Sequence, residues 1–596
     1  MLWLLVAVPL FAGAALALAG RRADRVAPAA GVLVAAVTLI LAIVVAAVAR
    51  PAVDAPLVAG IRAGLAVDGL SALMVVTVAG ATLAVLAFAA GDAELRTARF
   101  AGFMLLFAGA MLVTVTATTL AVLLMAWEVM GAMSWTLIAY HWREPESVRA
   151  AHTAFLTTRL ADVGLYVAAG AAVAGGVGTL ALAELPAASG LWLHVVAAGV
   201  VVAALGKSAQ LPFSFWLSQA MRGPSPVSAL LHSATMVAAG AYLLLRLAPL
   251  LAATGWAAPA VAWVGAATAL LLGLVAVAQS DLKQLLAAST CAQIGFMVLA
   301  AGVGGVTGGA LQLLAHAATK SLLFLAAGAW LVLLGTKQLG ELRGAARRYP
   351  LVGVTFTIGA ASLAGLPPLS LWVTKDLVLA AALEQSTALY IVGLSAALVS
   401  AIYSTKAVWW VWRSAERHSD PTEVTRRLRP TRRNAALPLG VLALLAALLG
   451  VPGLAFASAL WELVLSGLLA LVAVAVTWRV AGRIGAPPLL ASWFGVERVA
   501  HAVVGRPVLA LARLLARFDD GLDRSVTAVA RGTVVVARGL DRRGEGTVDG
   551  AVRGIAAGAR ALGRLARRPQ TGQVHQYYAQ AAAALAVLAL VVIVVR

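Results

Sequence analysis

The stretch Gly206–Arg246, GKSAQLPFSFWLSQAMRGPSPVSALLHSATMVAAGAYLLLR, decides the fold because it places a charge and helix breakers inside apolar sequence. A charged side chain near the middle of a bilayer costs at least ~2.5–3.5 kcal/mol, so we expect Lys207 to have a function. Pro212, Gly223 and Pro224 would interrupt any helix that crosses this stretch. Interrupted helices occur at membrane depth only where they are buried in protein or line a polar cavity. The stretch therefore predicts a broken helix surrounded by other spans.

The composition is that of a membrane protein with many spans. Of the 596 residues, 62% are hydrophobic and 12% are charged, whereas a soluble chain carries roughly 25% charged residues. Apolar runs of about 18–25 residues, each long enough to cross ~30 Å of hydrocarbon, recur up to about residue 480 and again over residues 579–595. The pattern predicts an all-α polytopic membrane protein with about sixteen transmembrane helices.

The distribution of lysine and arginine predicts the orientation of the chain. If the N-terminus lies outside, the inner loops hold most of the basic residues, among them Arg21, Arg143 and Arg347. The outer loops GVGTLALAELPAASG, GVGGVTGG and VPGLAF hold none. By the positive-inside rule we expect a multi-pass protein of the cell inner (plasma) membrane with its N-terminus outside. The first run is expected to be a retained span, with cleavage near residues 17–20 as the alternative.

After about residue 480 the chain becomes rich in arginine, alanine and valine. A basic face opposite an apolar one suits a helix that lies along the membrane surface or along neighbouring subunits, and a solvated tail is the alternative. Glycines that include Gly544, Gly546 and Gly550 predict breaks in this helix. The net charge of +20 comes largely from these arginines and from those of the short loops. We therefore interpret it as setting loop orientation and binding anionic lipid, not nucleic acid. The arginines that recur every seven residues, near one helix face, are Arg517, Arg524, Arg531 and Arg538, then Arg553, Arg560 and Arg567.

The cysteine count limits the chemistry of the chain. The single cysteine, Cys291, excludes a disulfide framework and a cysteine-ligated zinc or iron–sulfur site. No CxxC or HExxH spacing occurs. We expect neither a metal nor a cofactor in this chain, so any redox chemistry takes place elsewhere.

A small set of charged or titratable side chains lies inside the apolar runs. No metal-ligand or nucleophile pattern connects them. Acids, lysines and histidines on successive spans suit a chain of groups that bind and release protons. The set is Glu128, Arg159, Asp162, Lys207, His232, His316, Lys320, Lys375, Asp376 and Lys406.

The acids of this set predict two ion pairs. Glu128 has no basic neighbour within a turn of its own helix, so its counter-charge must come from another span, and Lys207 is the candidate. Such a pair would be a switch, because a buried lysine keeps its proton while paired and tends to release it when unpaired. A purely structural buried pair is the alternative. Arg159 and Asp162 stand three residues apart and are expected to form a structural ion pair.

The histidines and the last lysine have different expected roles. His232 follows the broken stretch, where a relay role and a core histidine bonded to the backbone are both open. His316 and Lys320 stand four residues apart on one face of an apolar helix, so both must face the protein interior, and a proton path is their simplest use. Lys406, with Tyr403, precedes WWVWR and is expected to be an interfacial anchor.

A second broken helix is predicted at Gly365, Pro367 and Pro368, and it again carries a lysine, Lys375, next to Asp376. Two proline-interrupted spans, each with its lysine, in corresponding parts of two halves indicate an inverted-repeat transporter. A charge pair at the end of a span, facing water, is the alternative.

Six stretches carry a resemblance to a known family: WEVMGAMSW, TTRLADVG, the opening stretch from GKSAQLPF to ALLHSATMVAAG, SDLKQLLAASTCAQIGFM, HAATKSLLFLAAG and GLPPLSLWVTKD. They resemble the antiporter-like membrane subunits of respiratory complex I, of the subunit L type (mitochondrial subunit 5 equivalent) of NADH-quinone oxidoreductase. The resemblance covers nearly the whole chain. GKSAQLPF and GPSPVSALLH are specific to the wider superfamily, which includes Mrp-type antiporters and membrane-bound hydrogenases.

The resemblance implies two inverted five-helix repeats, broken helices near Lys207 and Lys375, and a long C-terminal lateral amphipathic helix. The implied parts are residues 1–97, N-terminal transmembrane helices; 98–255 and 256–413, the two repeats; 414–485, additional transmembrane helices; 486–570, the lateral surface helix; and 571–596, a transmembrane anchor. The positions that match the family's proton relay are Glu128, Lys207, His232, His316, Lys320, Lys375 and Asp376.

Four positions depart from the family pattern. Ser218 and Gln219 stand where members usually have Pro-Asp, Arg222 stands where they have an acid, and Gln312 replaces a second histidine. These changes affect the residues around proton uptake, whereas the lysines and Glu128 are kept.

The expected function is that of a proton-translocating subunit of a complex I type NADH (or related donor):quinone oxidoreductase. Quinone, flavin and iron–sulfur clusters are expected only in partner subunits, which would be other hydrophobic subunits contacted along the lateral helix. Alternatives are a subunit of a Mrp-type cation/proton antiporter, membrane-bound hydrogenase or ion-driven uptake complex, and a scaffold whose channel is inactive.

Overall fold

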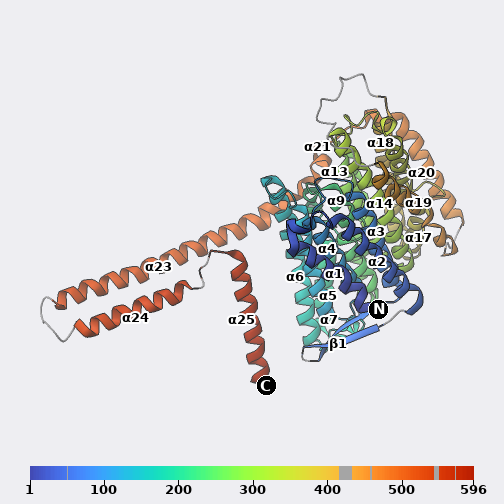
Figure 1. Cartoon of the computed structure of the whole chain (residues 1–596). Helices are drawn as coiled ribbons and strands as arrows, with labels where there is room; N and C mark the ends of the chain where they lie inside the picture. The colour runs from blue at the N-terminus through green and yellow to red at the C-terminus, as the bar shows by residue number, and fades with distance from the viewer. Residues whose placement is uncertain are drawn as a thin grey trace. The chain divides into compact units, whose positions relative to one another are not determined.

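The computed structural model describes residues 1–49, 52–58, 60–414, 432–456, 460–541, 549–568, 570 and 572–595. The chain divides into Met1–Glu497, a bundle of helices, and Arg498–Arg596, which holds the C-terminal helices (Figure 1). Fourteen of the described helices are long and apolar enough to cross a membrane. The predicted polytopic, mainly α-helical membrane fold is therefore confirmed.

Two of the helices in the first part of the bundle begin at residues whose side chains cap them. The carboxylate of Asp68 accepts a hydrogen bond from the backbone N–H of Ser71, and the Ser71 hydroxyl accepts one from the N–H of Asp68. This reciprocal capping box satisfies two of the donors that open a helix. The Thr97 hydroxyl caps the next helix by accepting a hydrogen bond from the backbone N–H of Phe100. The helices of this part are α1 (Leu2–Ala19), α2 (Ala27–Val44), α3 (Gly69–Ala89), α4 (Ala98–Thr116), α5 (Leu120–Ile138) and α6 (Pro145–Ala174).

A β-hairpin between α2 and α3 was not predicted from the sequence. Strands β1 (Ala52–Val58) and β2 (Ile61–Ala66) pair antiparallel. The carbonyl of Gly64 in β2 accepts a hydrogen bond from Thr118 N, and the carbonyl of Thr118 accepts one from Leu182 N. The hairpin thus joins the ends of distant segments at one end of the bundle, called here the hairpin end (Figure 1).

The helix that ends at Lys207 is interrupted, as predicted. Helix α7 (Leu191–Lys207) stops, and an irregular segment that contains Pro212 separates it from α8 (Phe215–Ala220). A further interruption at His232, between α9 (Ser225–Leu231) and α10 (Met236–Arg246), was not predicted. Polar side chains at both breaks can therefore face the interior of the bundle.

The second predicted interruption is also present. Helix α16 (Pro350–Ala364) ends at Gly365, whose φ of 77° is the left-handed conformation that glycine adopts without strain. Helix α17 (Ser370–Gln385) begins after Pro367 and Pro368. The remaining helices of this unit are α11 (Ala248–Ala253), α12 (Ala257–Ala278), α13 (Leu282–Gly302), α14 (Val306–Leu334), α15 (Ala345–Arg348), α18 (Thr387–Trp412), α19 (Arg432–Leu448), α20 (Leu460–Val480), α21 (Pro488–Ala491) and α22 (Val496–Ala500), which reaches into the second unit.

Two glycines bring α6 and α7 into backbone contact. A Cβ atom added to Gly199 would lie 2.2 Å from the carbonyl oxygen of Gly164, and one added to Gly164 would lie 2.4 Å from that of Gly199. Small residues at such crossings allow membrane helices to approach closely. The contact fixes α7, which carries Lys207, against α6, which carries Asp162.

The second unit contains α23 (Arg506–Asp541), α24 (Asp549–Arg567) and α25 (Val574–Val594). The first two fold back antiparallel, with Arg567 lying 3.8 Å from Asp523 (Figure 1). The segment over residues 486–570, predicted to be a surface helix with breaks, contains several shorter helices, of which α23 is ~54 Å long at 1.5 Å per residue. Gly550 lies within α24, whereas the breaks predicted at Gly544 and Gly546 lie outside the described residues.

Candidate functional site

Helices α5, α6 and α7 enclose a buried salt bridge between Lys207 and Asp162. The Lys207 ammonium lies 2.9 Å from Oδ2 of Asp162, and Trp127 Nε1 donates a 2.7 Å hydrogen bond to Oδ1. Lys207 is fully buried, and its ammonium also lies 5.0 Å from the centre of the Trp127 ring. Because both carboxylate oxygens are occupied, Asp162 is held in place for the lysine.

A second ion pair lies beside the first one. Glu128 of α5 pairs with Arg159 of α6, and Tyr166 donates a 2.9 Å hydrogen bond to the same carboxylate. The side chains of Arg159 and Glu128 are 41% and 26% exposed, so this pair is less buried than Lys207 and Asp162. A Cβ on Gly131, three residues after Glu128, would lie 3.5 Å from the Lys207 ammonium, which places the lysine within a turn of Glu128.

The partners of the predicted ion pairs are therefore exchanged. We predicted Glu128 with Lys207 and Arg159 with Asp162, but the structure pairs Glu128 with Arg159 and Lys207 with Asp162. The physical reason is burial. The compact lysine ammonium lies in the interior and needs the buried aspartate, whereas the long arginine reaches the half-exposed glutamate.

His232 lies at the break between α9 and α10, where a polar ring is surrounded by aromatic side chains. The ring is fully buried, with its centre 6.1 Å from Trp216 and 6.2 Å from Phe324. Neither ring nitrogen has a hydrogen-bond partner among the described residues. The interpretation as a core histidine bonded to the backbone is therefore wrong for this structure.

His316 and Lys320 lie side by side on α14 and are both fully buried. Nδ1 of His316 donates to the carbonyl of Ser233, 3.1 Å away, one residue after His232. Lys320 donates to the carbonyl of Leu286 at 3.1 Å and to the hydroxyl of Ser289 at 2.5 Å. Within the described part of the chain, Lys320 has no carboxylate at ion-pair distance. A buried lysine without a counter-charge is a group that can give up its proton.

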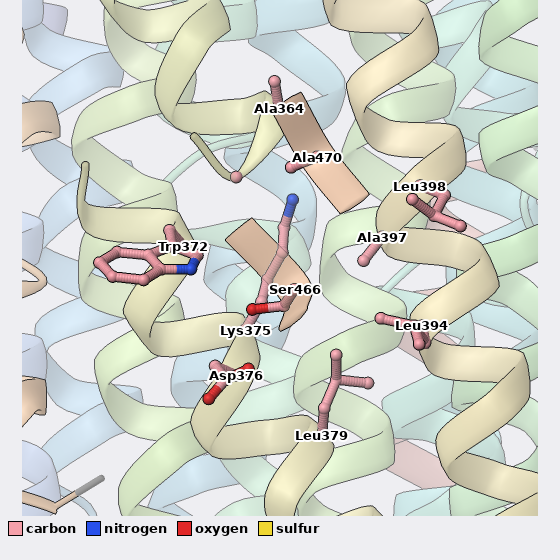
Figure 2. Close-up of a pocket in the computed structure, with 11 residues that line it drawn as sticks. Ala364, Trp372, Lys375, Asp376, Leu379, Leu394, Ala397, Leu398, Ser466 and Ala470 are labelled. Carbon is pink, nitrogen blue, oxygen red and sulfur yellow. The ribbon is translucent and has the colours of Figure 1, made fainter. Parts of the chain in front are cut away.

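Lys375 lies just after the second interruption. Its ammonium donates to the carbonyl of Leu363 at 2.6 Å and to the hydroxyl of Ser400 at 2.7 Å. Asp376 is also buried, and both residues line a cavity shown in Figure 2. The alternative that these charges form a pair facing water at the end of a span is therefore wrong.

A buried hydrogen-bond chain near Lys375 was not recognised in the sequence. Thr374 donates to Gln312 at 2.5 Å, Gln312 to Gln293 at 3.1 Å, and Gln293 to the hydroxyl of Tyr403 at 2.9 Å. Gln312, which replaces a histidine of the family pattern, thus both donates and accepts a hydrogen bond through its side-chain amide. Amides and hydroxyls scattered over four helices give no periodic signal.

Lys406 and Tyr403 are not interfacial anchors. Lys406 is 5% exposed and donates to the carbonyls of Val277 and Gln279 at the end of α12, at 2.6 and 3.0 Å. A lysine at the C-terminus of a helix satisfies carbonyls that lack intrahelical partners. The role of Lys406 is therefore to cap α12.

Two buried charges were missed because they lie near the ends of apolar runs. Lys283, which is not in the set of charges predicted inside the apolar runs, is 2% exposed and donates to the carbonyl of Gly223 at 2.8 Å. Glu462 is 7% exposed in the first turn of α20. Its position only three residues inside a predicted span is the signal that could have identified it.

Three of the four departures from the family pattern, Ser218, Gln219 and Arg222, lie in and just after α8. Ser218 donates to Gln284 at 2.9 Å and Gln219 donates to Glu497 at 2.8 Å. Arg222 forms an exposed ion pair with Glu146. These polar contacts join α8 and the turn after it to α13, α22 and α6.

Among the described residues, no group of three or more histidine, cysteine, aspartate and glutamate side chains could hold a metal ion. The geometry is that of separate titratable groups, buried one after another along interrupted helices.

Comparisons with known proteins identify related chains. Residues 117–400 match the family described as "NADH:quinone oxidoreductase/Mrp antiporter, TM". The chain is 34% identical over 382 residues to NAD(P)H-quinone oxidoreductase chain 5 of Picosynechococcus, covering 60% of this chain and 57% of that one. It is 36% identical over 367 residues to NADH-quinone oxidoreductase subunit L of Escherichia coli, covering 59% of each chain. The chain thus spans less than two thirds of the length of these curated relatives.

Two solved structures share the fold. A chain of the Mrp complex from Dietzia matches with a TM-score of 0.68 and 28% identity, over 100% of this chain and 63% of that chain. A chain of respiratory complex I from Thermus thermophilus matches with a TM-score of 0.67 and 26% identity, over 79% of this chain and 100% of that chain.

Proposed function

We propose that the protein is a proton-translocating membrane subunit of a complex I type NADH (or related donor):quinone oxidoreductase. The match of residues 117–400 to the NADH:quinone oxidoreductase/Mrp antiporter transmembrane family supports this proposal. The observation that carries the proposal is the series of buried titratable groups on interrupted and neighbouring helices. In order along the proposed path, the buried groups are Asp162, Lys207, His232, His316, Lys320, Lys375 and Asp376, and the half-buried Glu128 precedes them.

The first part of the path is a switchable lysine. While Lys207 is bound to Asp162, the carboxylate stabilises the ammonium. When Lys207 leaves Asp162, the buried ammonium loses its counter-charge and passes a proton towards His232, whose ring nitrogens are free to accept it. Glu128, held by Arg159 within a turn of the lysine, is the second carboxylate that biases this equilibrium.

The second part of the path runs through α14 and α17. His316 is bonded to Ser233, next to His232, and Lys320 lies one turn further along α14. Lys375 receives the proton at the second interruption, with Asp376 as the neighbouring acid. Water between these groups carries the proton across the gaps, because a buried polar region is normally hydrated.

The orientation follows from the charges of the loops. We place the hairpin end outside and the arginine-rich loops inside a cell inner (plasma) membrane, with the N-terminus outside. Residues 98–255 and 256–413 then correspond to two inverted five-helix repeats, each with one interrupted helix and its lysine.

Partner subunits complete the proposed activity. Electron transfer takes place in those subunits, which hold the quinone, the flavin and the iron–sulfur clusters. Helices α23 and α24 contact neighbouring hydrophobic subunits at the membrane surface, because each has one basic and one apolar face. Helix α25 anchors this segment in the bilayer.

A second candidate is a subunit of a Mrp-type cation/proton antiporter or a related ion-driven complex. One observation favours it: the Dietzia Mrp match covers 100% of this chain, whereas the complex I match covers 79%. Both candidates require the same buried path and differ in the partners that drive it.

Purification of the tagged full chain from its native membrane distinguishes the candidates. The first proposal requires co-purification with small hydrophobic subunits and a quinone-reducing arm that oxidises NADH. Co-purification with hydrophobic subunits alone, together with cation/proton exchange in vesicles, would establish the second candidate. A chain that is purified alone would contradict both.

A further inference from the structure

A small cavity lies next to Lys375 and Asp376 and opens onto a helix outside the matched family region. It has a volume of about 20 Å³, which is enough for one water molecule. Figure 2 shows the Lys375 ammonium directed towards Ala364 and Ala470, with Asp376 directed the other way. Ser466 of α20 lines the same cavity and hydrogen bonds to Asp376.

Helix α20 also supplies a buried carboxylate one turn before Ser466. Glu462 is 7% exposed and has no hydrogen bond or ion pair with any other residue that the structure describes. Residues four apart on a helix are neighbours on one face. Glu462 therefore lies one turn before Ser466, on the face of α20 that meets α17. A glutamate that is largely removed from solvent and has no ion-pair partner can bind and release a proton.

The acids on α17 and α20 form a series that reaches solvent. Glu462 interacts electrostatically with Asp376 on one side and with Glu384 on the other. Glu384 is exposed near the C-terminal end of α17, and Glu462 in the first turn of α20 is close enough for the two charges to interact. The order from the interior to the hairpin end is therefore Lys375, Asp376, Glu462 and Glu384.

We infer that Glu462 is a proton-carrying residue that completes the release path to the hairpin end. The inference rests on the proposed function. A proton leaves the Lys375 ammonium through a water molecule in the cavity and forms an O–H bond on Asp376, which leaves a neutral amine. Asp376 then transfers the proton to Glu462, Glu462 transfers it to Glu384, and Glu384 releases it to bulk water. Each carboxylate thereby returns to its ionised form.

This path depends on α20, which lies beyond the matched residues 117–400. Neighbouring carboxylates suit such a step, because two acids close together readily hold one proton between them. Ser466 keeps the Asp376 carboxylate at the cavity and acts as a positioning residue.

The test uses the assembled complex in sealed membrane vesicles, with NADH and a quinone as substrates and a pH-sensitive dye as the readout. Glu462→Gln keeps the size of the side chain but cannot carry a proton, and we expect proton pumping per assembled complex to fall about tenfold or more. Glu462→Asp restores a carboxylate and should retain at least about half of the wild-type rate. Glu184→Gln is the matched control, because Glu184 is an exposed glutamate that bonds only Thr179 among the described residues, and it should pump normally.

Two results would overturn the inference: normal pumping in Glu462→Gln, or equal losses in Glu462→Gln and Glu462→Asp at normal assembly, which would indicate a packing role. Lys320→Ala separates this inference from the proposed function. If Lys320→Ala stops pumping and Glu462→Gln does not, the relay stands and the release path through Glu462 is wrong. If neither variant lowers pumping, the proposed function itself is contradicted.

Discussion

Lys207 and Asp162 form a salt bridge 2.9 Å long, in which both side chains are almost completely buried. Trp127 binds the second carboxylate oxygen, so the aspartate cannot follow the lysine if the lysine moves. Motion of Lys207 would therefore separate the two charges.

The first prediction concerns the energy of this pair. Asp162→Asn leaves a buried ammonium without its carboxylate and should lower the free energy of unfolding by about 3–5 kcal/mol. The double variant Lys207→Met/Asp162→Leu removes both charges and should be more stable than Asp162→Asn. Thermal unfolding of the purified complex in detergent measures the difference. Additive effects of the two positions would show that they are not coupled.

The second prediction separates function from stability at Glu128. Because the Glu128–Arg159 pair is partly exposed, Glu128→Gln should change the free energy of unfolding by less than ~1 kcal/mol. Proton pumping in vesicles should nevertheless fall, since Lys207 loses its second carboxylate. Lys207→Ala should abolish pumping. Asp54→Asn, in the exposed Asp54–Arg62 pair of the hairpin, is the control and should pump normally.

The third prediction tests the contact between α6 and α7. Gly164→Ala places a methyl group against the backbone of Gly199 and should cost about 1–3 kcal/mol through overpacking. It should also displace Lys207 from Asp162 and reduce pumping. Gly170→Ala on the same helix meets open space, so it should have neither effect. Equal stability of the two variants would contradict the close approach of these helices.

The fourth prediction concerns the hydrogen-bond chain beside Lys375. Tyr403→Phe leaves the Gln293 amide without its acceptor and should destabilise the protein by about 1–3 kcal/mol. Pumping should fall because Ser400, three residues away on α18, loses a neighbour that helps to orient it towards Lys375. Tyr349→Phe removes a hydroxyl that has no hydrogen bond to any described residue, and it should be neutral.

The sequence predicts which residues are charged at membrane depth much better than it predicts their partners. Hydropathy and proline positions were sufficient to locate the breaks after Lys207 and before Lys375, because both are local properties. The exchange of partners among Glu128, Arg159, Asp162 and Lys207 depends on how α5, α6 and α7 are rotated against one another. No spacing within a single helix contains that information.

The missed residues have a common cause. Lys283 and Glu462 lie close to the ends of apolar runs, where a charge is normally explained by contact with water or lipid headgroups. Packing by distant helices buries them instead. The β-hairpin was missed because its short strands lie between two spans and receive hydrogen bonds from residues more than 50 positions away.

The hairpin also has a consequence for the order in which the chain is assembled. Main-chain hydrogen bonds join Gly64 to Thr118 and Thr118 to Leu182, but the ribosome delivers these segments one after another. The Gly64 carbonyl therefore lacks this partner until Thr118 has been synthesised, and the Thr118 carbonyl lacks its own partner until Leu182 follows. The hairpin is therefore synthesised before its later hydrogen-bond partners. A bundle truncated before Leu182 would leave this set of main-chain hydrogen bonds incomplete.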